Sequence, residues 1–88
     1  MQKRNHNMTL ADLDVGSSAK VMSFLFNPDD NTGTRRALEL GIRPGIKVKV
    51  AHKAPLGGNP LAVQTPTNLI ALGKKEAATI VVEEVEHA

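Results

Sequence analysis

The segment RRALELGIRPGIKVKV, residues 35–50, contains the end of a helix, a turn and the start of a strand. Its first half is rich in good helix formers, and Gly41 stands where a left-handed residue commonly closes a helix. Ile42 can then pack back on the last turn, and Pro44 prevents the helix from continuing. Just upstream lie three residues that can cap the start of this helix: Asp30, Asn31 and Thr32.

The second half of the segment alternates between apolar and basic residues, which predicts a half-buried antiparallel strand. One face carries the apolar side chains of Ile46, Val48 and Val50, and His52 continues this face as a residue at its rim. The opposite face carries Lys47, Lys49 and Lys53.

The rest of the chain reads as short strands separated by turn residues. Strands are predicted at 19–26, 61–65, 68–72 and 78–85, with helical turns near 10–13 and 74–77. With the strand that begins at residue 46, the fold class is mainly β: about five antiparallel strands and one short α-helix inserted between the first and second strands. Such an arrangement favours a small closed or partly closed barrel. We expect a flexible N-terminal tail at 1–8 and a single domain at 9–86.

The composition limits the classes of function. The chain has 88 residues, enough for one domain. Aromatic residues make up 2% of it, so the core must be aliphatic, with Phe24 and Phe26 predicted to lie in it. So few rings argue against binding of single-stranded nucleic acid, which uses aromatic stacking. The absence of cysteine excludes disulfides and thiolate metal sites and fits a cytoplasmic location, and no stretch is apolar enough to span a membrane.

The middle of the chain is basic. It carries one acidic residue, Glu39, among six positive ones: Arg35, Arg36, Arg43, Lys47, Lys49 and Lys53. This region could meet phosphate or an acidic partner surface, or it could be a solvated face that keeps a small protein soluble.

The loop APLGGNP, residues 54–60, separates two strands and lacks the lysine and the following helix of a phosphate-binding loop. Its glycines suit a tight turn. Leu56 either folds back to cap the end of the barrel or stays exposed as a docking residue. The histidines are scattered and the serines have no recognisable His and Asp partners. We therefore predict no metal site, no cofactor and no enzymatic activity.

Three segments together resemble the FeoA family: residues 35–50, the loop at 54–60, and IALGKKEAATIVVE at 70–83. The resemblance covers roughly residues 9 to 85. It implies an SH3-like β-barrel and a non-enzymatic cytoplasmic accessory role in ferrous iron uptake, through contact with FeoB, the membrane transporter with a cytoplasmic GTP-binding domain. The sequence departs from the family at Thr67 and Gly73, where a Gly and an Arg are common.

On this basis the predicted partner-binding residues are the loop residues and the basic residues that would steer the approach: Pro55, Leu56, Gly57, Gly58, Asn59, Arg43, Lys47, Lys49 and Lys53. One alternative is a free-standing domain that regulates another soluble protein, such as a metal-dependent repressor. A second is an RNA-binding barrel. We expect a monomer or weak self-association, because an incompletely closed barrel leaves a sheet edge that can pair with another chain.

Overall fold

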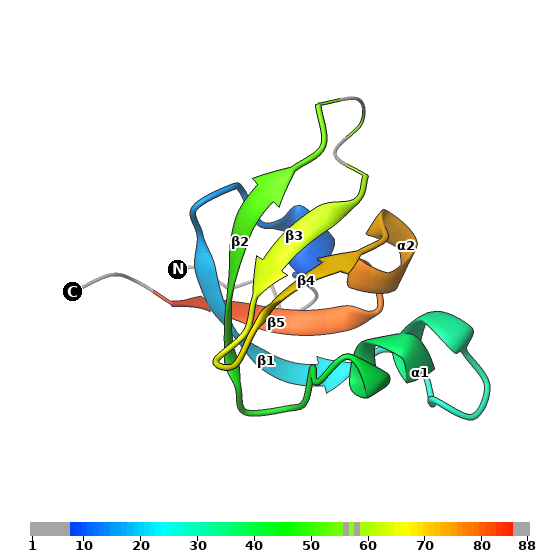
Figure 1. Ribbon diagram of the computed structural model, residues 1–88. Coiled ribbons are helices and arrows are strands. Elements are labelled where there is room, and N and C mark those ends of the chain that lie inside the picture. The colour runs from blue at the N-terminus through cyan, green and yellow to red at the C-terminus, as the bar shows by residue number, and fades with distance from the viewer. Residues whose placement is uncertain (1–7, 56, 58, 86–88) are drawn as a thin grey trace.

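The structure is a computed structural model that describes residues 8–55, 57 and 59–85 (Figure 1). A 3₁₀ turn at Leu10–Asp12 comes before the first strand. The strands are β1 (Ser18–Phe24), β2 (Lys47–Lys53), β3 (Leu61–Gln64), β4 (Leu69–Leu72) and β5 (Ile80–Val85). The helices are α1 (Thr32–Glu39) and α2 (Lys74–Ala77).

The five strands form one antiparallel sheet in the order β4-β3-β2-β1-β5, and the sheet curls into a small barrel (Figure 1). Helix α1 is inserted between β1 and β2 and lies at one end of the barrel, while α2 joins β4 to β5. The predicted fold class is therefore confirmed.

Both ends of α1 follow from local sequence signals. Asn31 is the N-cap, and its side-chain oxygen accepts a hydrogen bond from the backbone N–H of Thr34 at 2.9 Å. At the other end Gly41 has φ +100°, and the N–H of Ile42 donates to the carbonyl of Ala37 at 3.0 Å. Ile42 is completely buried. This turn therefore fixes the direction in which the chain enters β2.

The core is aliphatic, as the composition predicts. Its fully buried large side chains come from all five strands, from the segment before β1 and from the turn after α1. They are Leu10, Leu13, Val21, Ile42, Val48, Val50, Leu61, Val63, Leu72 and Ile80. Phe24 packs against this core, but Phe26 is 51% exposed, so its predicted core position is wrong. The reason is that β1 ends at Phe24. Asn27 then starts a turn by accepting a hydrogen bond from the N–H of Asp29 at 2.8 Å.

The alternation of β2 breaks after Val50, where a β-bulge shifts the pairing with β3. His52 is then exposed, and Lys53 lies opposite the buried Leu61 and is half-buried. His52 therefore does not continue the apolar face, and Lys53 does not share the outward face of Lys47. The prediction of one strict alternation through residue 53 is wrong for these two positions.

Candidate partner-binding surface

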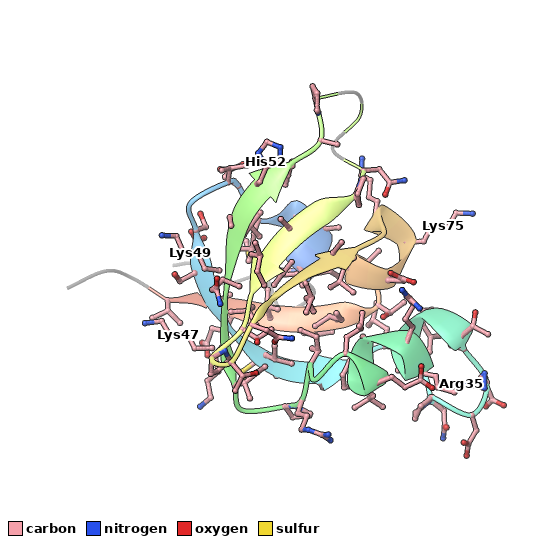
Figure 2. All side chains as sticks on the ribbon, in the orientation of Figure 1. Arg35, Lys47, Lys49, His52 and Lys75 are labelled. Carbon is pink, nitrogen blue, oxygen red and sulfur yellow. The ribbon has the colours of Figure 1, made fainter. Side chains whose placement is uncertain are left out.

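The outward face of β1 and β2 carries a group of three lysines, which we call the lysine face: Lys20, Lys47 and Lys49. Lys47 lies directly opposite Lys20 in the pairing of the two strands, and Lys49 lies one pleat further along β2. All three side chains are exposed. Figure 2 shows Lys47 and Lys49 pointing away from the barrel on the same side. Lys20 is absent from the sequence-based prediction because only the strand register places it beside Lys47.

One acidic residue, Glu83, lies next to the lysine face. Glu83 of β5 lies opposite Lys20 in the pairing of β1 with β5. The salt bridge in the described residues is elsewhere, between Arg36 of α1 and Glu76 of α2. Like charges directly opposite each other on neighbouring strands destabilise a sheet. An acidic partner placed over these lysines would relieve that repulsion.

The loop after β2 is closed at its base and tied to α2. The N–H of Ala54 donates to the carbonyl of Pro60 at 3.1 Å. Further out, the backbone N–H of Lys74 donates to the side-chain oxygen of Asn59 at 3.0 Å, and its ammonium donates to the carbonyl of Gly57 at 3.4 Å. The Asn59 side chain thus helps to hold the loop against the start of α2.

The tip of this loop is exposed at the positions that the structure describes. Pro55 and Gly57 are exposed, and Gly57 has φ +78°, which suits a tight turn. Leu56 and Gly58, the other two predicted contact residues of the tip, lie outside the described residues.

The predicted basic residues do not gather in one compact patch. Lys53 ends β2 next to the loop, and Lys47 begins the same strand, about 20 Å away at the usual rise per residue. Arg43 is exposed in the turn before β2. The predicted site is therefore spread along β2, with the loop after one end of the strand and Arg43 before the other.

An open cleft of about 750 Å³ lies elsewhere, between the end of β1 and the two helices, and sequence reasoning missed it. Leu25 and Phe26 line it and are 48% and 51% exposed. Glu76 also lines it, and its carboxylate accepts from the N–H of Gly73 at 2.8 Å and pairs with Arg36 at 3.3 Å. The apolar sequence of residues 19–26 pointed to a buried strand, so no sequence signal marked this cleft.

The described part of the chain contains neither a metal-binding cluster nor a membrane-spanning helix. No group of three or more His, Cys, Asp or Glu side chains is placed there to hold a metal ion. None of the helices there has the length and hydropathy needed to cross a membrane.

A small five-stranded antiparallel barrel with one inserted helix is the architecture of small SH3-like domains. The model of the FeoA domain matches residues 8–84, and the chain belongs to the FeoA family. FeoA domains are small SH3-like domains associated with ferrous iron transport in bacteria, and they are not a known family of enzymes.

Solved structures agree with this assignment. The FeoA-like protein of Clostridium acetobutylicum superposes with a TM-score of 0.81 at 27% identity, over 97% of this chain and 95% of that one. FeoA of Stenotrophomonas maltophilia, solved with zinc, is 38% identical over 86% of this chain and 89% of its own, with a TM-score of 0.73. That protein is described as a prokaryotic SH3 domain and a suggested activating factor of ferrous iron transport.

The same fold also occurs in a manganese-dependent transcriptional repressor. The match has a TM-score of 0.75 at 18% identity and covers 96% of this chain and 45% of the repressor. At this identity the likeness concerns the fold alone. Comparison with curated protein sequences gives no match.

Proposed function

We propose that this protein is a non-enzymatic accessory of a FeoB-type ferrous iron transporter and binds the cytoplasmic side of that transporter. The observation that carries the proposal is the lysine face, which lies on a domain whose family is associated with ferrous iron transport. The description of the Stenotrophomonas relative as an activating factor supports the same role.

The positive charge of the lysine face favours an acidic surface on the partner. Lys20, Lys47 and Lys49 are exposed, and Lys20 and Lys47 lie opposite each other. An acidic surface would be attracted to these side chains and would accept hydrogen bonds from their ammonium groups. Charges at the rim of an interface mainly raise the association rate and make it sensitive to salt. The contact is therefore transient and weakens as ionic strength rises.

The loop after β2 supplies the apolar part of the contact in this proposal. Pro55 and Gly57 are exposed at its tip, and Leu56 enters the proposal on its sequence alone. A leucine buried in a partner contributes about 1.5–3 kcal/mol, which suits regulation by a reversible contact. The bonds from Lys74 to Gly57 and Asn59 tie these two loop residues to the start of α2.

Titration of the purified protein against the detergent-solubilised transporter, with and without guanine nucleotide, tests the proposal. We expect saturable binding that the double variant Lys47→Glu/Lys49→Glu weakens by about 10-fold or more at low salt, because attraction becomes repulsion at two positions. Leu56→Arg is expected to weaken binding as well, because it removes the apolar part of the contact.

A matched control reverses the same number of charges on the other side of the molecule. Arg35 on α1 and Lys75 on α2 are exposed and point away from the lysine face (Figure 2). Arg35→Glu/Lys75→Glu should leave the affinity within about threefold of the original, since distant surface charges are screened by salt. Equal losses of affinity in the two double variants would mean that the lysine face attracts the transporter only non-specifically, and would contradict its role as the binding site. Absence of binding in every nucleotide state would refute the transporter as partner.

A further inference from the structure

The two edges of the sheet differ in how they are covered. At the β5 edge, the N–H of Val82 donates to the carbonyl of Met8 at 3.0 Å, and Thr9 bridges to Val81. The segment before the 3₁₀ turn therefore covers this edge. At the other edge, β4 pairs with β3 on one side, and no strand of the described chain pairs with its other side.

The backbone of β4 directs hydrogen-bonding groups toward this open side. The N–H of Thr65 donates to the carbonyl of Asn68 at 2.8 Å and closes the hairpin between β3 and β4. Hydrogen-bonded and non-hydrogen-bonded pairs alternate from there, so Ile70 and Leu72 bond to β3. The N–H and C=O groups of Leu69 and Ala71 point the other way, and none of them bonds to a residue in the described part of the chain.

The side chains of β4 give this edge no protection. Natural sheets protect an exposed edge with charged residues, proline or bulges. The sequence of β4 is Leu-Ile-Ala-Leu, and its register with β3 is regular throughout. Leu69 is 58% exposed, more than any other large hydrophobic side chain that the structure describes. Only the shortness of the strand limits its pairing.

We propose that β4 pairs in antiparallel fashion with β4 of a second copy of this chain, around a two-fold axis at Ile70. The unpaired groups of Leu69 and Ala71 require an extended backbone as partner, and β4 itself offers the same groups at the same spacing. In this register Leu69 lies beside Ala71 of the second copy, so a large side chain meets a small one. No charged residue lies within either strand, so the pairing brings no like charges together.

The resulting dimer is weak and independent of the proposed transporter contact. Four residues from each copy bury far less than the roughly 1,200 Å² of a stable interface. We therefore expect the association to be weak. The lysine face is on β1 and β2, so β4 pairing leaves it available. The strands carry no charge, so the dimer responds little to salt, unlike the transporter contact.

Amide hydrogen exchange and sedimentation equilibrium from about 20 µM to about 2 mM, a range that brackets weak affinities, test the pairing. The apparent mass should rise with concentration. The amides of Leu69 and Ala71 should exchange severalfold more slowly at the high concentration, while those of Ile70 and Leu72 stay protected throughout. Leu69→Lys should abolish the rise in mass, because it places like charges on the edges of both copies.

The matched control is His52→Lys, which adds the same charge at an exposed position of β2, away from the β4 edge. This variant should associate as the original protein does. The proposal is overturned if the original protein stays monomeric at the highest concentration, or if Leu69→Lys associates equally well. It is also overturned if the amides of Leu69 and Ala71 are equally protected at both concentrations, since the chain would then cover this edge itself.

Discussion

Replacing Leu72 with Ala is expected to lower the free energy of unfolding by about 2–5 kcal/mol, through lost apolar burial and the cavity that remains. Leu72 is completely buried at the end of β4, among the aliphatic side chains that fill the barrel. A chain of 88 residues has a total stability of roughly 4–13 kcal/mol, so the loss is a large fraction of it. Urea unfolding followed by far-UV circular dichroism measures the change, since the chain contains no Trp or Tyr.

The same strand supplies a matched control, because Leu69 is 58% exposed and Leu72 is not exposed at all. Leu69→Ala removes the same atoms and should change the stability by no more than about 0.5 kcal/mol. Equal losses in the two variants would contradict the inward orientation of Leu72 and therefore the register of β4. The comparison is best made at low micromolar protein concentration, where pairing between copies does not contribute.

Replacing Gly41 with Val is expected to cost about 2–3 kcal/mol, since a β-branched residue at positive φ is strained. Gly41 has φ +100° and lies between the end of α1 and the buried Ile42. A Cβ atom added at Gly41 would meet no heavy atom within 4 Å, so the loss in Gly41→Ala reports the backbone strain alone. Urea unfolding measures the loss, and Gly41→Ala should show a smaller loss of the same sign.

Gly73 is the control for this prediction. Its φ is −66°, and an added Cβ would lie at an ordinary distance of 3.5 Å from the side chain of Glu76. Gly73→Ala should therefore cost no more than about 1 kcal/mol, the loss expected when Ala replaces Gly as the N-cap of α2. Equal stability of Gly41→Val and Gly73→Ala would contradict the left-handed backbone conformation of Gly41 at the end of α1.

The parts of the fold that local signals determine could be predicted from the sequence. Asn31, one of three candidate caps, begins α1, Gly41 ends it, and Val48 and Val50 face the core as their alternation predicts. These features depend on neighbours within a few residues. The bulge after Val50 depends instead on how β2 pairs with β3, and the sequence of β2 does not predict it. The exposure of Phe26 depends in the same way on where β1 ends.

The same distinction holds for the residues of the candidate site: some could be predicted from local sequence, and others depend on strand pairing. Lys47 and Lys49 could be found from alternation alone, because both lie before the bulge. Lys20 could not be added to them, since it lies in a different strand and only the register brings it opposite Lys47. Lys53 was assigned to the wrong face for the opposite reason, because the bulge lies between it and Lys49. The predicted partner contact at Pro55, Gly57 and Asn59 stays a prediction.

The order of the strands has a consequence for the chain while it is being made. β1 is the first strand to be synthesised, and its two neighbours in the sheet are β2 and β5, of which β5 is the last. Synthesis runs from the N-terminus, so one side of β1 has no partner until the residues around Ile80–Val85 have left the ribosome. Pairing between such distant segments is also intrinsically slow. The nascent barrel therefore closes only after β5 has been translated, and until then the backbone edge of β1 that pairs with β5 has no partner strand.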